Sequence, residues 1–505
     1  MVTLSVSMIR QARCTTLRRL QPFARGYATP AGAELKVSNQ FLSINTRSLN
    51  RATQPNTSFK SVTHYDDNAP QSTLDMIHAH TSYLLNTYAR PSILFTHGKG
   101  CKLFTTSPSS TSSSGVQEYL DFTAGIAVNA LGHGDEQIAE IMKDQQSKLT
   151  HASNVYWNEY AGELAKLLVE NTRKQGGLGL KSDSAPGTGA KVFFSNSGTE
   201  ANEGALKFVR KYAKEVNPSM ASTKTAIVCF TNAFHGRSMG ALSVTPNPKY
   251  QEPFAPLIPN VRVGELNQHE GLEELIDENV CGVIIEPIQG EGGLNEGTRD
   301  WMIKLAKRAR EVGAILIYDE IQCGLFRTGK MWAHSGFPLE AQPDIVTMAK
   351  PLANGFPIGA IMVRDHVAEK ISVGSHGTTF GGQPLATRVG AHVVSRLSAP
   401  EFLSRMNDTA AHLDTLLERL PKLFPNIIPA PVRGRGFMRG IPFAHADAPA
   451  ELVKRARQRG VLLLTAGKDA VRLVPSLTVT KEECDHAIGV IESCLVTMEE
   501  DGFGK

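Results

Sequence analysis

One lysine, Lys350, ends the apolar segment 344–349, and proline and glycine residues follow it within a few positions. An apolar run rich in β-branched residues that passes into a Pro/Gly-rich segment is typical of a buried parallel strand and the loop at its carboxyl end. Open α/β sheets bind their ligands at that edge. The amine could therefore react with a carbonyl group there. The alternative is a lysine whose side chain runs from a strand end into water.

Two carboxylates, Asp319 and Glu320, end another apolar segment, 315–318. Burying a carboxylate costs free energy unless a cation or a strong hydrogen-bond donor matches it. A protonated pyridine nitrogen is one partner that would do so.

An anion site is expected in segment 193–213, which reads as a strand, a Ser-Asn-Ser-Gly-Thr turn and an amphipathic helix. Gly198 allows a tight turn, and the first N–H groups of the helix, together with the Thr199 hydroxyl, could bind phosphate. A simple helix cap is the alternative, and this pattern alone does not decide between the two.

Segment 232–241 follows a strand and places an aromatic residue next to a histidine, a glycine and an arginine. A planar ring could stack on Phe234, and Arg237 could bind a carboxylate with two parallel hydrogen bonds. Taken together, a phosphate site, a stacking aromatic, an acid and a lysine are the groups that pyridoxal phosphate requires.

The elements that must position these residues alternate between strands and helices from about residue 116 to 385. Strands are expected at 191–196, 225–230, 241–245, 282–287, 314–320, 344–350 and 358–363, and helices at 199–216 and 298–313. The pattern predicts an α/β fold with a mostly parallel sheet covered by helices on both faces. After residue 386 the pattern changes to that of a smaller α+β domain, with strands within 432–443, 461–467 and 470–477 and a helix from Lys481.

Five motifs in this region resemble the class III, fold type I aminotransferases that use pyridoxal phosphate: SNSGTEANEGALKFVRKY, FHGRSMGALS, VIIEPIQGEGG, LIYDEIQCGLFRTG and MAKPLANGFPIGA. The resemblance covers roughly residues 75–495. Segments 121–133 and 151–168 look most like the acetylornithine aminotransferase branch. The resemblance to the class III aminotransferases implies a large cofactor-binding domain at 116–385 and a small C-terminal domain at 386–505. It also implies an N-terminal segment, 71–115, that packs with the small domain.

Carried over residue by residue, the resemblance implies how the cofactor is held. Lys350 would bond covalently to its aldehyde, Asp319 would keep its ring nitrogen protonated, and Phe234 would stack on the ring. The remaining contacts would be Gln322 with the ring hydroxyl and Gly198, Thr199 and, from the neighbouring subunit of a homodimer, Thr379 with the phosphate. Many relatives carry Ser-Thr where this chain has Thr378-Thr379, a departure that keeps both hydroxyls.

The same resemblance implies the reaction and its substrate contacts. The δ-amino group of N2-acetylornithine would pass to 2-oxoglutarate, giving N-acetylglutamate 5-semialdehyde and glutamate in arginine biosynthesis. Arg237 would bind the far carboxylate, Arg472 would bind the near carboxylate of glutamate, Glu291 would pair with Arg472 in its absence, and Thr378 would lie beside the substrate. Ornithine, 4-aminobutyrate and diamino-acid aminotransferases and an aminomutase share most of these motifs. A non-catalytic binding protein of the same fold is disfavoured by the intact Lys350 and Asp319.

Composition and charge indicate where the protein works and which partners it lacks. Segment 1–27 carries five arginines and no acid, the first being Glu34, which fits a mitochondrial transit peptide and predicts a matrix protein. Its removal changes the net charge from +4 to about −1, which argues against a nucleic-acid partner. Segment 28–70 is expected to be a poorly ordered lead-in, and 107–115 an enlarged hairpin loop.

Cysteine and histidine usage points to no disulfide framework and no metal centre. The seven cysteines are scattered without a CxxC pair and are expected to be reduced thiols. His133, His151, His235 and His376 lie too far apart in sequence to predict a metal site. No run of 18 apolar residues is present, so we expect no membrane span.

Overall fold

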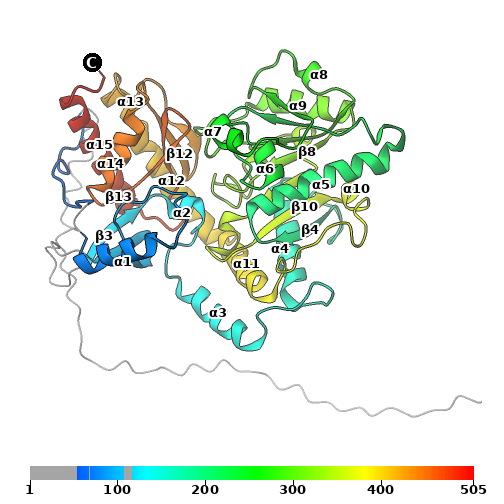
Figure 1. The fold of residues 1–505 in the computed structure, drawn as a ribbon, viewed down its shortest axis with the longest axis horizontal. Coiled ribbons are helices and arrows are strands. Elements are labelled where there is room, and N and C mark those ends of the chain that lie inside the picture. Colours follow the sequence, from blue (N-terminus) through cyan, green and yellow to red (C-terminus); the bar gives the residue numbers. More distant parts are fainter. Residues whose placement is uncertain (1–53, 67–68, 107–115, 505) are drawn as a thin grey trace, which may run out of the picture. The chain divides into compact units, whose positions relative to one another are not determined.

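The computed structural model describes residues 54–66, 69–106 and 116–504, which contain the whole predicted α/β region (Figure 1). Its largest sheet has seven strands. In spatial order they are β4 (Ala190–Ser195), β10 (Gly359–Arg364), β9 (Ile345–Met348), β8 (Ile315–Asp319), β7 (Val280–Ile285), β5 (Ala226–Phe230) and β6 (Val261–Gly264). All neighbouring pairs are parallel except those of β10, which runs antiparallel to β4 and β9. The predicted mostly parallel sheet is confirmed.

Helices cover both faces of this sheet because its strands are apolar on both sides. On β8, Ile315 and Ile317 pack in a cluster with residues of α5 (Gly198–Val216), whereas Leu316 and Tyr318 pack in a cluster with residues of α9 (Arg299–Glu311). Further helices before the C-terminal region are α2 (Ala124–Ala127), α3 (Glu136–Lys148), α4 (Glu159–Gln175), α7 (Pro248–Gln251), α8 (Leu272–Leu275) and α10 (Asp365–Ala368).

One predicted strand is wrong. Residues 241–245 were expected to be extended, but Met239–Ser243 form helix α6. The Glu203 carboxylate accepts hydrogen bonds from the N–H groups of Gly240 and Ala241 at the start of this helix, at 2.7 and 3.2 Å. A tertiary contact from α5 therefore overrides the local preference of this short apolar run.

A second sheet pairs three strands from the N-terminal part of the chain with one strand from its C-terminal part. Its order is β1 (Phe95–Lys99), β2 (Lys102–Thr106), β3 (Val116–Asp121) and β13 (Val461–Leu462), and β3 pairs with β13 in parallel. The antiparallel pairing of β2 and β3 fits the hairpin expected there, although its 107–115 loop lies outside the described residues. β3 thus belongs with a C-terminal strand rather than with the large sheet.

The third sheet, of order β11 (Arg433–Arg435), β12 (Met438–Pro442), β15 (Ala470–Leu473) and β14 (Leu464–Ala466), is antiparallel throughout. Helices α12 (Pro400–Leu417), α13 (Leu420–Leu423), α14 (Ala448–Arg457) and α15 (Lys481–Glu500) belong to this C-terminal region. α11 (Pro384–Leu397) instead packs against α4 and the turn at 350–353. Figure 1 shows α1 (Gln71–Thr81) and β3 in the same part of the fold as α14 and α15.

Residues 54–66 differ from the poorly ordered lead-in expected for 28–70. The Asn56 N–H donates to the Glu492 carboxylate on α15 at 2.8 Å, and the Phe59 N–H donates to the Ser493 hydroxyl at 3.2 Å. Arg457 on α14 binds both carboxylate oxygens of Asp66. Partners far along the chain therefore hold this polar segment. The transit segment 1–27 lies outside the described residues.

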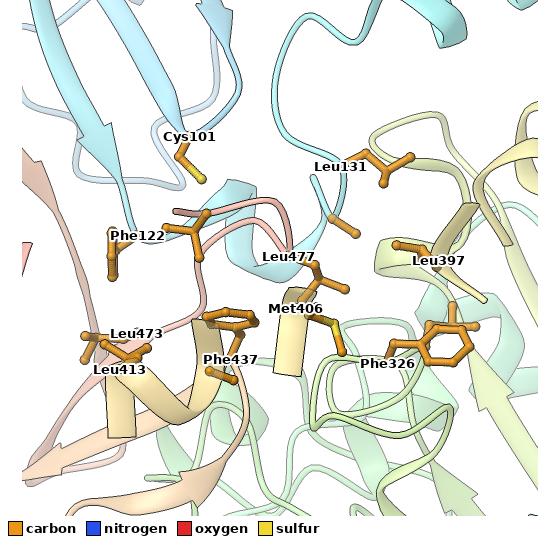
Figure 2. Packing of buried hydrophobic residues seen from close by; sticks show 14 of the residues in the cluster. Cys101, Phe122, Leu131, Phe326, Leu397, Met406, Leu413, Phe437, Leu473 and Leu477 are labelled. Carbon is orange, nitrogen blue, oxygen red and sulfur yellow. The ribbon is translucent and has the colours of Figure 1, made fainter. Parts of the chain in front are cut away.

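The hydrophobic core runs across these sheets. Figure 2 shows Phe122 after β3, Phe326 after β8, Leu413 on α12 and Phe437 before β12 in one cluster of buried side chains. The six described cysteines are all buried and unpaired. In the part of the chain that the structure describes, no helix has the length and apolar character that a membrane crossing requires.

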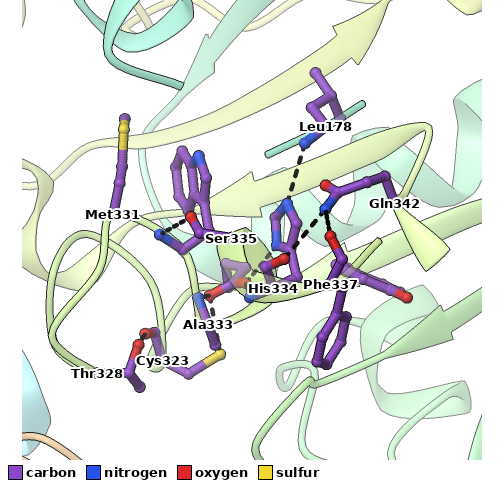
Figure 3. A network of polar contacts seen from close by, with 12 residues as sticks. Leu178, Cys323, Thr328, Met331, Ala333, His334, Ser335, Phe337 and Gln342 are labelled. Carbon is purple, nitrogen blue, oxygen red and sulfur yellow. Dashed lines mark hydrogen bonds and ion pairs between the residues drawn. The ribbon is translucent and has the colours of Figure 1, made fainter. Parts of the chain in front are cut away.

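A buried polar network supports the loop after β8 (Figure 3). Glu320 accepts hydrogen bonds from the N–H groups of Ala333 and His334 at 3.0 and 3.1 Å and lies 2.6 Å from His334 Nδ1. The Leu178 N–H donates to His334 Nε2, so Nδ1 carries the proton and donates to Glu320. Cys323 Sγ donates to the same carboxylate at 3.2 Å. Four donors thus stabilise a carboxylate that is fully buried.

We expect Glu320→Gln to lower the free energy of unfolding by about 2 kcal/mol, because an amide NH₂ would face N–H donors in a site without solvent. Urea titration followed by circular dichroism measures this change. Glu311→Gln is the control: Glu311 is exposed and pairs with Lys307 and Arg308 at the surface, so this substitution should leave the transition where it is. An unchanged Glu320→Gln transition would contradict a stabilising role of the network.

Candidate active site

A cavity of about 380 Å³ opens at the carboxyl ends of β8 and β9. Asp319 is the last residue of β8, and Lys350 follows β9 by two positions. The two strands are parallel neighbours, with Asp319 opposite Thr347, so their ends reach the same edge of the sheet. The cavity walls come from Val128 and from residues within 196–199, 234–237, 286–291, 319–322 and 349–358.

The Lys350 amine has neither a hydrogen bond nor an ion pair with any residue that the structure describes. Burial lowers its pKa to about 8, and the positive charge of Arg472 acts in the same direction. The carboxylates of Asp319, Glu286 and Glu291 oppose this change. An amine with this pKa is substantially neutral, and so nucleophilic and basic, near pH 8.

Asp319 is held by three N–H donors. Its Oδ2 accepts from His235 Nδ1 at 2.7 Å and from Asn202 Nδ2 at 2.8 Å, and its Oδ1 accepts from the Ile321 N–H at 3.0 Å. These donors suit a carboxylate and fix its orientation. Sequence reasoning missed His235 and Asn202, although His235 lies between Phe234 and Arg237 in the same motif.

The N-terminus of α5 lines one side of the cavity. Ser197 caps this helix by accepting from the Glu200 N–H, and Gly198 and Thr199 begin its first turn. The Thr199 hydroxyl lies 2.6 Å from that of Ser238. Gly236 has φ +138°, and a Cβ there would lie 2.3 Å from Thr199 Oγ1, so glycine is needed for this close approach.

Arg237 and Phe234 lie on an aromatic wall of the cavity. The Arg237 guanidinium carbon lies 3.6 Å from the centre of the Tyr250 ring and 5.6 Å from that of Phe234. Among the described residues Arg237 has no carboxylate partner, so these cation–π contacts orient a guanidinium that is exposed to ligands.

Arg472, on β15, is almost fully buried and reaches two cavity residues. Its Nη2 donates to Glu291 Oε2 at 3.1 Å, and its Nη1 donates to Gln322 Oε1 at 2.9 Å. Burial lowers the pKa of Arg472, and Glu291 opposes that change. The structure therefore places Arg472 and Glu291 in contact.

Glu286 is a cavity residue that sequence reasoning missed, although it stands in the quoted motif VIIEPIQGEGG. It follows β7 and accepts from the N–H groups of Phe234 and Gly290, each at 2.8 Å. Burial raises its pKa to about 7, and His235 partly offsets that rise. Glu286 thus orders the two backbone segments that carry Phe234 and Glu291.

The structure brings most of the predicted site residues to this one cavity. Those that line it are Gly198, Thr199, Phe234, Arg237, Glu291, Asp319, Gln322 and Lys350. Thr378, Thr379 and Arg472 are not among the lining residues, and Arg472 reaches the cavity through its contacts with Glu291 and Gln322. The Thr378 hydroxyl accepts from Asn196 Nδ2 at 3.0 Å, which puts it next to a lining residue, and Thr379 is exposed.

The residues present fit pyridoxal phosphate. The first-turn N–H groups of α5 and the Thr199 hydroxyl are donors for a phosphate, and Phe234 is an aromatic platform. Asp319 is an anchored acid, and Lys350 is an amine without a partner among the described residues. The described residues contain no group of His, Cys, Asp or Glu side chains that could hold a metal ion.

Comparison with known proteins decides the family. A model of the class-III aminotransferases matches residues 93–495, which is most of the chain. The chain belongs to the class-III aminotransferases. The mitochondrial acetylornithine aminotransferase of Neurospora crassa is 46% identical over 85% of this aminotransferase and 89% of its own length.

Solved structures agree with this assignment. The aminotransferase resembles the ornithine aminotransferase of Toxoplasma gondii with a TM-score of 0.75 and 28% identity over 86% of this chain and 97% of that one. It resembles the N-acetylornithine aminotransferase of Stenotrophomonas maltophilia with a TM-score of 0.67 and 29% identity over 84% and 99% of the two chains. A second structure of the Toxoplasma enzyme has PLP at partial occupancy in its active site. The predicted fold type is confirmed.

The pKa of Lys350 makes cofactor uptake by the apo-aminotransferase dependent on pH. Below about pH 8 the buried amine is protonated, so the rate of covalent uptake of pyridoxal phosphate should rise about tenfold per pH unit and level off above that pH. Stopped-flow absorbance measures this rate. Lys350→Ala should bind the cofactor without this inflection. An inflection near 10.5, the ordinary lysine value, would show that burial does not act on the amine.

Proposed function

We propose that this class-III aminotransferase transfers the δ-amino group of N2-acetylornithine to 2-oxoglutarate and so serves arginine biosynthesis. The observation that carries the proposal is a pair of arginines at one cavity: Arg237 lines it and has no described carboxylate partner, and Arg472 lies behind it, paired with the lining residue Glu291. This arrangement can accept a donor with one carboxylate and an acceptor with two. The Neurospora relative supports the choice of donor.

The cofactor in this proposal is pyridoxal phosphate, whose phosphate Gly198 and Thr199 would hold and whose ring Phe234 would support. When bound, it supplies an electron sink that makes a proton on the neighbouring substrate carbon removable. Asp319 would hold a proton at the ring nitrogen, and Gln322 would contact the ring hydroxyl. The cavity keeps these charges away from bulk water, which strengthens their electrostatic effect.

Lys350 has two tasks in this proposal. Its neutral amine would hold the cofactor, and the same amine would move a proton at the substrate carbon. The lowered pKa suits both tasks, because the neutral amine is needed each time. His235 and Asn202 keep the Asp319 carboxylate oriented during the cycle.

The two arginines distinguish the substrates. Arg237 binds the carboxylate far from the reacting carbon in N2-acetylornithine and in glutamate. Glutamate has a second carboxylate next to its reacting carbon, and Arg472 binds it after release from Glu291. With N2-acetylornithine bound, Glu291 stays paired with Arg472 and prevents a buried unpaired charge.

We propose that the working enzyme is a homodimer in the mitochondrial matrix. Large apolar side chains are exposed at Trp157 (99%), Tyr83 (89%) and Leu85 (86%), which a second copy of this chain could cover. Thr379 lies beside another exposed aromatic, Phe380, and in a dimer would reach the phosphate in the neighbouring subunit. The basic segment 1–27 supports import into mitochondria.

Ornithine is the second candidate donor, favoured by the likeness to the Toxoplasma structure. A panel of N2-acetylornithine, ornithine and 4-aminobutyrate, each with 2-oxoglutarate, separates these donors by kcat/KM. We expect the highest value for N2-acetylornithine. A higher value for ornithine would overturn the assigned donor and leave the aminotransferase family assignment in place.

Asp319→Asn should lower kcat by at least about 100-fold, roughly 3 kcal/mol, because an amide keeps the volume but cannot hold a proton at the ring nitrogen. Steady-state kinetics at saturating cofactor measures the loss. Asp277→Asn is a control, since Asp277 pairs with Arg262 in a half-exposed contact outside the cavity. An unchanged rate for Asp319→Asn would show that ring protonation does not depend on this carboxylate.

Glu291→Ala and Arg472→Ala should have opposite effects on the two half-reactions. Glu291→Ala leaves Arg472 unpaired when N2-acetylornithine is bound, so that half-reaction should slow by at least about tenfold more than the glutamate half-reaction. Arg472→Ala removes the second carboxylate site and should harm the glutamate half-reaction more. Single-turnover absorbance measures each half-reaction. Equal losses in both, for either variant, would rule out the exchange of partners.

A further inference from the structure

Segment 432–440 carries three arginines that the proposed function leaves unused. Two of them reach the loop 288–296, which carries Glu291. Arg433 on β11 donates from Nη1 to the Gly293 carbonyl at 3.0 Å, and Arg435 forms a 2.7 Å ion pair with Glu296. The loop is closed on itself by the isolated bridge between Ile288 and Glu296. Residues of the small C-terminal sheet therefore bind the loop that follows β7 of the large sheet.

Arg433 also binds the segment that carries Arg472. Its guanidinium donates to both carboxylate oxygens of Asp469, at 3.1 and 2.6 Å. Asp469 lies in the turn between β14 and β15, three residues before Arg472, and Gly293 lies two residues after Glu291. A single guanidinium thus connects the backbone beside Glu291 with the turn beside Arg472.

Other contacts fix the same loop on the same sheet. The Gly467 N–H, in that turn, donates to the Glu291 carbonyl at 2.6 Å. Leu294 is buried against Gly440 of β12, where an added Cβ would lie 3.1 Å from the leucine Cβ. Gly293 and Leu294 have φ of +106° and +60°. A leucine in the left-handed region needs such external contacts to stay there.

We infer that Arg433 and Asp469 form a positioning pair that holds the backbone of Glu291 at a set distance from Arg472, so that the Glu291 side chain alone changes partner. This inference rests on the proposed function. The Glu291–Arg472 contact is one 3.1 Å bond between two separate sheets, and its length depends on how the loop sits on β15. Loosening the loop weakens this contact, while the pairing of Arg472 with Gly440 of β12 and Leu464 of β14 keeps Arg472 itself in place.

The test compares Arg433→Met, Asp469→Asn, Glu291→Ala and the double variant Glu291→Ala/Arg433→Met as cofactor-loaded enzymes. Arg433→Met should slow the N2-acetylornithine half-reaction by about tenfold and the glutamate half-reaction by less than about threefold. Asp469→Asn should change the ratio of the two half-reaction rates, N2-acetylornithine over glutamate, in the same direction. In the double variant Arg433→Met should add no further change to the ratio, because it acts through Glu291.

Glutarate, a dicarboxylate that cannot be transaminated, gives a second readout by calorimetry. It must displace Glu291 from Arg472, so its dissociation constant should fall in Glu291→Ala and, by a smaller factor, in Arg433→Met. Arg457→Met is the matched control, since it also loses a two-oxygen contact with an aspartate at similar exposure. It should leave the half-reaction ratio and the glutarate constant at their unmodified values.

Two results would overturn the inference, and they differ. If Glu291→Ala shifts the ratio while Arg433→Met and Asp469→Asn behave like Arg457→Met, the positioning pair is wrong and the proposed function stands. If Glu291→Ala leaves the ratio unchanged, the exchange of partners fails and the positioning pair fails with it.

Discussion

The cost of burying charge around one cavity governs this structure. Each buried ionisable group needs hydrogen-bond or ion-pair partners, and the number of partners differs from group to group. Asp319 has three N–H donors, Glu286 has two, and Arg472 has Glu291 and Gln322. Lys350 has no such partner among the described residues, and burial lowers its pKa to about 8. The lysine is therefore the group most open to a ligand, while its neighbours are held in place.

Several distant segments must meet to create this balance. The parallel pairing of β8 and β9 brings Asp319 and Lys350 to one edge, and the small antiparallel sheet brings Arg472 into contact with Glu291 and Gln322, which line the same cavity. A buried arginine after β8, Arg327, connects these parts: it donates to the carbonyls of Pro475 and Phe437 in the C-terminal region and of Ala127 in α2. Burial lowers its pKa to about 9. The apolar cluster of Figure 2 crosses the same junction.

Predictions from the sequence succeeded where periodicity or a motif was strong. The strands at 282–287 and 314–320 and the helix at 199–216 were anticipated because their apolar spacing matches their burial in the sheet. The strand at 241–245 was wrong, since Glu203 captures the N–H groups that begin α6. The sequence did not predict that residues 54–66 are ordered. Their partners, Glu492, Ser493 and Arg457, lie 436, 434 and 391 residues away along the chain.

The sequence by itself determined the chemistry of the site: a lysine after a β-branched strand, an acid at the end of another strand, and a helix start with Ser, Gly and Thr are local patterns set by neighbouring residues. Only the tertiary structure decided how these charges are matched. His235 and Asn202 on Asp319, Glu286 on the Phe234 backbone, and Arg433 on Gly293 and Asp469 are contacts between different elements of the fold. Spacing along the chain carries no distance information for such pairs, because the path between them passes through other elements of the fold.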